Sequence, residues 1–462
     1  MLVLVRLLPP EVYGQFGFVT ALLGFLTLYS FREFLGHTLV VRDAGEVHYQ
    51  DHFTAGAVLQ VGVFGLANLV AFGLRWIPEY AAVAPVLHVM SALFLLDLPS
   101  ELRVKMLERV LDWRRLRVLH GVALVGGGAL SIVMAATGWG VYALLVPTLL
   151  VPVVFAYDLW FRAGWRPTWQ WSRRRFAPAW AFGTARISSV SFTSAANVLE
   201  ASWLGMLSFA TFGIFGRAVG LGQLLCGRAA GLLAQAVFPV LARIPPESES
   251  YRKASALYLR GVAWVVTPLA VCFALLARPA VELLYGPQWS AVVPLLPWAM
   301  AGAALLAVGQ TGYTVLLARQ RQQACLVVDA WRLAGTTLAL GLLAGSGMQA
   351  YLAGLVVVHA LSLLVVLGWL RRDGVVEGRT IGAALGPPLM SVAVAAVVGH
   401  VVGWVAAPGG MTLPAAALEA AVLALVYVLA LRAGFRRQLV ELVRQLPEQR
   451  RISRWLWLEP VA

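Results

Sequence analysis

The stretch MQAYLAGLVVVHALSLLVVLGWLRR, residues 348–372, decides the fold class of this chain. Residues 348–369 contain no Asp, Glu, Lys or Arg. An apolar segment of about 20 residues in a helix is long enough to cross the hydrocarbon of a bilayer. Arg371 and Arg372 follow at once, as is typical of the cytoplasmic end of a membrane helix. The stretch therefore predicts a transmembrane helix.

Segments of the same kind fill most of the 462 residues, which are 60% hydrophobic and only 13% charged. Soluble globular domains carry about 25% charged residues, so a water-soluble fold is excluded. The alternation of a membrane β-barrel is lacking, and we expect an all-α polytopic membrane protein. Thirteen spans are predicted, at residues 12–31, 53–74, 80–99, 118–137, 139–160, 178–200, 206–241, 254–277, 291–317, 323–345, 348–369, 381–406 and 413–433. Residues 1–8 are apolar but too short to span, and we expect them to be the end of a truncated first helix, the fourteenth.

Lys and Arg gather in alternate joints between the predicted spans, above all in 103–117, 162–175 and the tail after Leu431. Because positive residues are retained in the cytoplasm, this bias predicts a multi-pass protein of the cell membrane with a cytoplasmic C-terminus. The net charge of +14 lies in these joints and not on one exposed face, so no nucleic-acid partner is expected. The basic tail either lies as an amphipathic helix on anionic lipids or stays solvated.

A short signature occurs twice in the chain. Tyr13-Gly14-x-Phe16-Gly17 recurs as Phe212-Gly213-x-Phe215-Gly216, at a constant offset of 199 residues. Repeats in the same orientation predict two pseudo-symmetric six-helix lobes around a central cavity. We expect an N-lobe at 1–175, a C-lobe at 176–370, an additional C-terminal helix pair at 371–433 and a basic cytoplasmic amphipathic tail at 434–462.

Polar residues within the spans are the candidate binding groups. An arginine at membrane depth costs at least about 2.5–3.5 kcal/mol, so it normally faces a wet cavity or a partner. The span 206–241 brings small and polar residues onto one helical stripe, which comprises Gly213, Gly216, Arg217, Gly220, Gly227, Arg228, Gly231 and Gln235. Since a guanidinium binds phosphate oxygens bidentately, an anionic head group is the expected ligand. The predicted substrate-binding residues are Arg186, Asn197, Glu200, Arg217, Arg228 and Gln235.

A structural alternative is that Arg186 or Arg217 forms an internal ion pair with Glu200. Asp329 and Arg332 lie one turn apart in a later span, a spacing that permits a local ion pair with a mainly structural role. The three cysteines and seven histidines lack metal-ligand spacing, and no GxSxG sequence occurs. No catalytic residue, metal or cofactor is therefore predicted, and the chain is not expected to be an enzyme.

Several stretches resemble the Wzx-like polysaccharide and oligosaccharide flippases of the MATE-related exporter superfamily. They are residues 7–16 (LLPPEVYGQF), Phe182-Gly183, 197–200 (NVLE), Leu204-Gly205, 212–218, 283–289 (LLYGPQW) and 293–296. The resemblance implies two lobes, a cationic cavity and alternating access that carries a polyprenyl-(pyro)phosphate-linked oligosaccharide or polysaccharide unit across the cytoplasmic membrane. Position 200 is Glu where the family commonly has Asp.

Other functions remain open at this point. A MATE-type multidrug exporter would share the architecture, although its cationic substrates favour acidic residues over arginines. A membrane-embedded glycan polymerase or ligase would need a larger extracytoplasmic loop than the sequence offers, and a scaffold of a glycan-assembly complex needs no transport site. Expected partners are the lipid-linked glycan, membrane lipids, and glycan polymerase or glycosyltransferases of the same pathway. The few acidic residues within spans leave coupling to protons, sodium or the membrane potential undecided.

Overall fold

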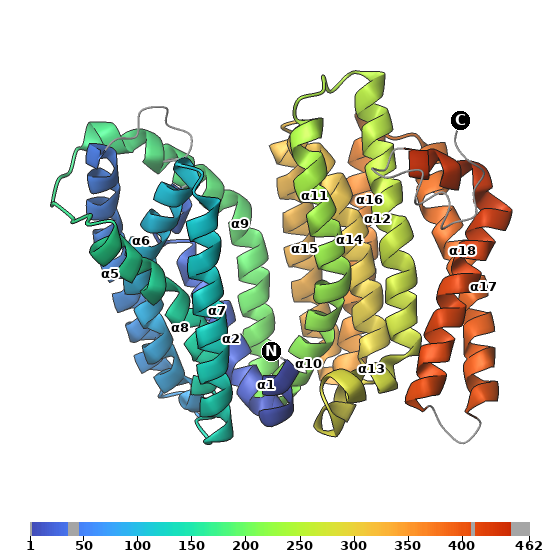
Figure 1. The fold of residues 1–462 in the computed structure, drawn as a ribbon, viewed down its shortest axis with the longest axis horizontal. Helices are drawn as coiled ribbons and strands as arrows, with labels where there is room; N and C mark the ends of the chain where they lie inside the picture. The colour runs from blue at the N-terminus through green and yellow to red at the C-terminus, as the bar shows by residue number, and fades with distance from the viewer. Residues whose placement is uncertain (1, 36–45, 408–411, 445–462) are drawn as a thin grey trace. The chain divides into compact units, whose positions relative to one another are not determined.

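The computed structural model describes residues 2–35, 46–407 and 412–444, and every regular element in these ranges is a helix (Figure 1). The N-terminal elements are α1 (Leu2–Leu7), α2 (Pro10–Thr27), α3 (Arg32–Leu35), α5 (Glu46–Leu74), η1 (Ala81–Val83), α6 (Ala84–Arg109), α7 (Trp113–Ala136), α8 (Tyr142–Tyr157), η2 (Asp158–Arg162), α9 (Arg173–Leu207) and α10 (Phe209–Gly222). The C-terminal elements are η3 (Gln223–Gly227), α11 (Arg228–Leu241), α12 (Glu249–Leu275), α13 (Ala277–Leu284), η4 (Pro287–Val292), α14 (Leu296–Ala318), α15 (Gln322–Leu343), η5 (Ala344–Ser346), α16 (Met348–Arg372), α17 (Gly378–Ala406) and α18 (Leu413–Arg444). The predicted all-α membrane fold is confirmed.

Eleven helical segments of the described chain are long and apolar enough to cross a membrane. Sequence predicted thirteen spans, and the two that fall outside this set are residues 12–31 and 178–200, on α2 and α9. Both are helical, but α9 starts with three arginines and continues through a run of Ser and Thr, which lowers its hydropathy. α18 runs past the expected end at 433 to Arg444, with a kink at Phe435. The rest of the predicted tail, 445–462, lies outside the described residues.

The chain forms two compact units, Met1–Gly216 and Arg217–Ala462, and the boundary falls within α10. The predicted lobes at 1–175 and 176–370 stay a prediction. In the structure α9 packs along α2 and α3 and so belongs to the first unit. The start of α9 finds apolar partners there, since Phe176 and Ala179 cluster with Phe31, Phe34 and Leu35.

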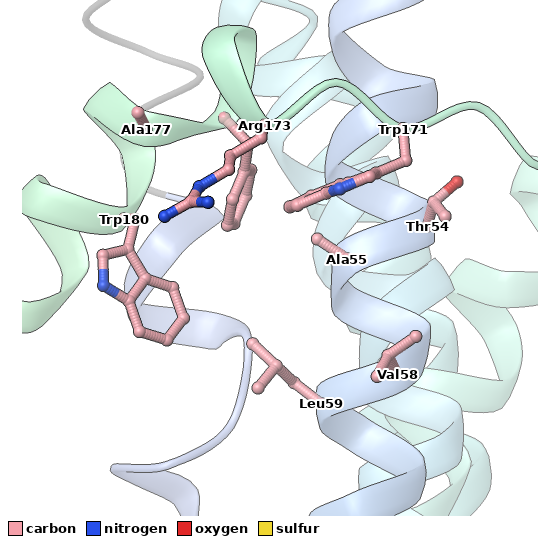
Figure 2. Close-up of a pocket in the computed structure, with 9 residues that line it drawn as sticks. Thr54, Ala55, Val58, Leu59, Trp171, Arg173, Ala177 and Trp180 are labelled. Carbon is pink, nitrogen blue, oxygen red and sulfur yellow. The ribbon is translucent and has the colours of Figure 1, made fainter.

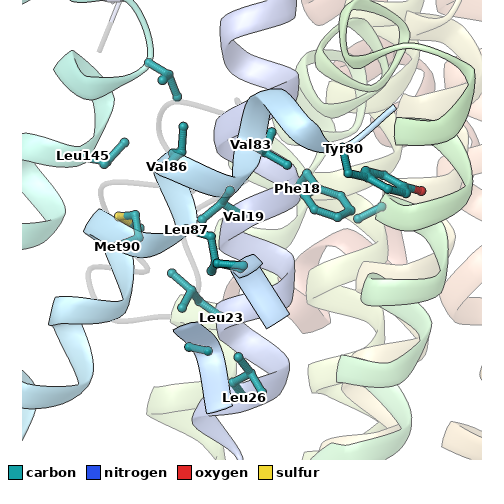
Figure 3. Close-up of a cluster of buried hydrophobic side chains, with 14 of the residues drawn as sticks. Phe18, Val19, Leu23, Leu26, Tyr80, Val83, Val86, Leu87, Met90 and Leu145 are labelled. Carbon is teal, nitrogen blue, oxygen red and sulfur yellow. The ribbon is translucent and has the colours of Figure 1, made fainter. Parts of the chain in front are cut away.

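One apolar core of the first unit lies between α2, α5, α6 and the start of α8 (Figure 3). Residues of α2 at helical spacing, Phe18, Val19, Leu23 and Leu26, turn one face to α6 and are almost fully buried. The Phe18 ring stacks on Tyr80 at 4.9 Å between centroids, and the Tyr80 hydroxyl donates to the carbonyl of Ser202 at 2.6 Å. Burial raises the pKa of Tyr80, so this hydroxyl stays protonated and keeps its hydrogen bond to α9.

The two copies of the aromatic-glycine signature meet in the first unit. A Cβ atom added to Gly14 would lie 1.7 Å from the carbonyl oxygen of Phe209, and one added to Gly213 would lie 1.9 Å from that of Pro10. Glycine therefore allows the backbones of α2 and α10 to touch where they cross, as small residues do in membrane helix pairs. The two copies of the repeated signature thus pack against one another, through Gly14 on α2 and Gly213 on α10.

The second unit is organised around α12. The Tyr251 hydroxyl donates to the carbonyl of Val315 on α14 at 2.9 Å. The Trp264 indole donates to the carbonyl of Ala384 on α17 at 3.2 Å, and the Tyr427 hydroxyl of α18 donates to the carbonyl of Trp264 at 2.8 Å. Buried aromatic side chains with a polar end thus fasten both C-terminal helices to α12, since a buried hydroxyl or indole N–H is costly when left unpaired.

Replacing Gly14 or Gly213 by Ala should destabilise the protein by about 1–3 kcal/mol, because the methyl group forces α2 and α10 apart. The thermal unfolding midpoint of the detergent-solubilised protein measures the effect. Gly216→Ala is the matched control on α10, since a Cβ added there would have no neighbouring atom within 4 Å among the described residues. Equal midpoints for Gly213→Ala and Gly216→Ala would contradict the close crossing.

Candidate functional site

Three of the predicted binding residues lie on α9, in the first unit. Asn197 is exposed and Glu200 is half-buried. Arg186 also falls within the helix, but its side chain lies outside the described residues. The predicted ion pair of Glu200 with Arg186 or Arg217 stays a prediction.

The other three predicted residues follow one another along α10 and α11, in the second unit. Arg217 is half-buried, whereas Arg228 and Gln235 are exposed. The Tyr285 hydroxyl donates to the carbonyl of Arg217 at 3.5 Å. Burial raises the pKa of Tyr285 and the charge of Arg217 opposes this, so the hydroxyl remains a donor beside the guanidinium.

The expected stripe of small and cationic residues is divided in the structure. Gly216, Gly220 and Gly231 face open space, because a Cβ added to any of them would meet no described atom within 4 Å. Gly213, in contrast, packs against α2, and Gly227 lies against the Gln223 side chain. One physical reason is the π-helical segment Gln223–Gly227 between Arg217 and Arg228, which turns less per residue than the α-helix assumed from sequence. The open part of the stripe retains Arg217, Arg228 and Gln235.

Sequence reasoning missed a pocket in the first unit. It has a volume of about 770 Å³ and lies between α5 and the start of α9 (Figure 2). Thr54, Ala55, Val58 and Leu59 of α5 form one wall, and Trp171, Arg173, Phe176, Ala177 and Trp180 form the other. The lining is mostly apolar, with the charge of Arg173 at its edge, a combination that suits a hydrocarbon chain joined to an anionic group. The signal was present in sequence, because tryptophans beside the basic run 173–175 are typical of a membrane interface.

A set of hydrogen bonds fastens the pocket wall to α5. The buried Gln50 side chain donates to the carbonyl of Arg166 at 2.8 Å and accepts from the amide of Thr168 at 2.6 Å. Asp51, only 1% exposed, accepts from the amide of Ser172 at 3.1 Å and forms an ion pair with Arg175. These bonds hold the segment that presents Trp171 and Arg173.

A second ion network crosses three helical segments of the first unit. Asp158, 1% exposed, bonds Nε of Arg103 at 2.7 Å and Nη2 of Arg115 at 2.8 Å. Its two arginines come from α6 and α7, and Asp158 itself opens η2 after α8. A buried carboxylate with two guanidinium partners is fully compensated, so this cluster has a structural role.

The second unit contains a polar cluster around Asp329 and Arg332 of α15. Asp329 accepts a hydrogen bond from the Tyr313 hydroxyl of α14 at 2.8 Å, and Arg332 donates through Nε to Ser362 of α16 at 3.0 Å. Asp329 and Arg332 thus each gain a bond to a neighbouring helix, and their opposite charges still attract one another. Gly309 of α14 lies beside the guanidinium, and a Cβ added there would be in ordinary van der Waals contact with it, at 3.7 Å from Nη2 of Arg332.

These helices define a multi-pass membrane protein with a transporter fold. The fold is similar to that of a solved structure titled lipid II flippase MurJ, inward closed conformation, with a TM-score of 0.76 at 10% identity over 95% of this chain and 97% of that one. An inward-facing multidrug resistance MATE family transporter of the MOP superfamily is also similar, with a TM-score of 0.62 at 16% identity over 81% of this chain and 93% of that one. At such identities the likeness establishes the fold alone.

The family follows from sequence comparison. The model of the family described as polysaccharide biosynthesis protein matches residues 3–294, and the chain belongs to this family. The succinoglycan biosynthesis transport protein ExoT of Rhizobium meliloti (strain 1021) is 23% identical over 305 residues, which cover 64% of this chain and 60% of that protein. The chain thus matches less than two thirds of that relative's length. The family predicted from the sequence motifs is confirmed.

Asp51→Asn should loosen the pocket wall, because the half-exposed Arg175 loses its charged partner. We expect faster trypsin cleavage at Arg173–Arg175, because the segment opens more often when this charged contact is lost. Glu108→Gln is the control, since it removes a carboxylate from the partly exposed pair with Lys105. Unchanged cleavage in Asp51→Asn would show that other contacts hold the segment.

Proposed function

We propose that this protein is a flippase that moves a polyprenyl-(pyro)phosphate-linked oligosaccharide or polysaccharide unit across the cytoplasmic membrane. The observation that carries the proposal is the family match over residues 3–294. The fold agrees with it, since its alignment covers 97% of a structure titled lipid II flippase. The substrate class is proposed from the family, described as polysaccharide biosynthesis protein, and from the name of ExoT, a succinoglycan biosynthesis transport protein. Transport without a chemical step, and hence a non-enzymatic role, is part of the proposal.

The open part of the α10–α11 stripe supplies groups suited to the anionic end of such a substrate. Arg228 is exposed and Arg217 is half-buried, and both lie in an apolar span that runs from Phe209 to Leu241. A positive charge at membrane depth is expensive, and a phosphate that forms charge-assisted hydrogen bonds with both guanidinium groups would lower that cost. Exposed Gln235, further along α11, offers an amide to sugar hydroxyls. Arg186, Asn197 and Glu200 of α9 stay proposed substrate-binding residues.

Orientation and partners complete the proposal. The bias of Lys and Arg among the joints supports a C-terminus in the cytoplasm of a plasma-membrane protein. The lobes at 1–175 and 176–370, inferred from the repeat, would exchange access between the two sides of the membrane. Glycosyltransferases would supply the lipid-linked unit inside and a polymerase would consume it outside.

A multidrug exporter is the second candidate, because a MATE family transporter shares the fold. The chemistry of the stripe disfavours it. Arginines attract anions, whereas an exporter of cationic drugs gains from carboxylates. Two transport assays, one with a lipid-linked glycan and one with a cationic dye, therefore distinguish the two functions.

Arg217→Ala combined with Arg228→Ala should abolish most transport of the lipid-linked glycan. Each lost charge-assisted hydrogen bond is worth about 1.5–3 kcal/mol, so apparent affinity should fall by at least about 10-fold. The measurement is the lipid-linked oligosaccharide on the cytoplasmic leaflet and the finished glycan at the surface of a gene-deletion host that carries each variant.

Arg243→Ala is the matched control, because Arg243 is an exposed arginine just beyond the end of α11. It should restore surface glycan as the wild type does. Surface glycan and intermediates that are unchanged by deletion of the gene would overturn the flippase proposal. If the double variant restores surface glycan, the two arginines are not needed for substrate binding, and the flippase function itself still stands.

A further inference from the structure

Glu419 is buried in the C-terminal helix pair without a hydrogen-bond partner among the described residues. It lies on α18 with 0% of its surface exposed, and neither Oε1 nor Oε2 has a donor from the described chain within hydrogen-bonding distance. The helix belongs to a candidate membrane span of high hydropathy. Because an ionised carboxylate without donors is very costly in apolar surroundings, a residue of this kind in a membrane helix is a functional candidate.

The neighbouring helix leaves a slot that fits this carboxyl group. Gly399 and Gly403 lie one turn apart on α17, facing α18. A Cβ added to Gly403 would be 2.3 Å from Oε2 of Glu419, and one added to Gly399 would be 3.7 Å from its Cγ. The glycine at 403 therefore makes room for the carboxyl group between the helices, whereas a Cβ at 399 would only be in ordinary van der Waals contact.

The groups of the described chain that face Glu419 are few. From α17, Nδ1 of His400 lies 3.8 Å from Oε1, and the His400 side chain is 68% exposed. From α12, the other helix packed against this pair, the titratable neighbour is the thiol of Cys272. Neither supplies a permanent positive charge. Asp158 in the first unit provides the contrast, since two arginines bond it.

Both residues lie close to one end of the membrane span. His400 is six residues before the end of α17 at Ala406, and Glu419 is six residues after the start of α18 at Leu413. At the helical rise, each is about 9 Å from its helix end. This is less than half of the roughly 30 Å hydrocarbon core, so the exposed imidazole lies within reach of the headgroup region. The predicted orientation makes this the extracytoplasmic surface.

We propose that Glu419 is a proton-binding site that exchanges with extracytoplasmic water through His400. A proton from water binds the exposed imidazole, and the imidazolium Nδ1–H then passes its proton to Oε1 of Glu419. The products are a neutral imidazole and a neutral carboxylic acid. The negative charge of the Glu419 carboxylate is thereby removed by a proton, and no other ion is needed between the helices. The pH at the outer surface would thereby set the charge between α17 and α18. The site is separate from the arginine stripe and does not depend on the proposed substrate.

Infrared spectroscopy of the purified protein in lipid nanodiscs tests the proposal without any glycan. The wild type should show a neutral-carboxyl C=O band that decreases as the pH is raised, and Glu419→Gln should lose that band. Glutamine is neutral and nearly the same size, so the helix pair should stay folded. His400→Gln should retain the band but slow its isotope shift after transfer to D2O, because the proton route is removed.

Two further variants sharpen the result. Glu377→Gln removes an exposed carboxyl immediately before α17 and should leave the band and its exchange unchanged. Gly403→Ala places a methyl group where Oε2 lies and should shift the frequency of the band. A band that survives Glu419→Gln, does not change with pH, or exchanges equally fast in His400→Gln would overturn the proposal. Since no transport is measured, failure here leaves the flippase proposal untouched.

Discussion

The hydrocarbon of a bilayer offers no hydrogen-bond partner to a peptide group, and the rest of this structure depends on that constraint. Each membrane segment must satisfy its own backbone, so every regular element in the described residues is a helix. Polar side chains in the membrane likewise need partners within the protein. The helices themselves associate by packing, and small residues let their backbones come close, as Gly14 and Gly213 show at the crossing of α2 and α10.

Polar side chains inside the protein meet this constraint in three different ways. Asp158 is neutralised by two arginines and Asp329 is held by a tyrosine hydroxyl, so each has a partner and a fixed place. Arg217 and Arg228 are cations on an otherwise apolar span, where an anionic substrate would lower the cost of their charge. Glu419 has no hydrogen-bond donor among the described helices, and the proposed binding of a proton would neutralise its carboxylate. The first kind stabilises the fold, the second is the proposed substrate site and the third is the proposed proton site.

Part of the candidate site could be predicted and part could not. The arginines of α10 and α11 stood out because charges are rare in apolar spans, but their alignment was overestimated since a π-helical segment is invisible in a periodicity argument. The pocket of the first unit needed the tertiary structure, because Gln50 and Asp51 bind a segment more than 100 residues away. Glu419 could be noted in sequence only as an isolated acid, and its environment depends on what α17 and α12 place beside it.

The sequence by itself determined the all-α membrane class, the approximate positions of the spans, the family motifs and the charge bias of the joints. These are local properties, since hydropathy over about 20 residues fixes whether a helix enters a bilayer. Only the tertiary structure decided that α9 packs with α2 and α3, that the two signature copies touch, and which buried charges find partners. Such contacts join residues far apart in the chain, and among many apolar helices the hydrophobic pattern alone does not select one neighbour over another.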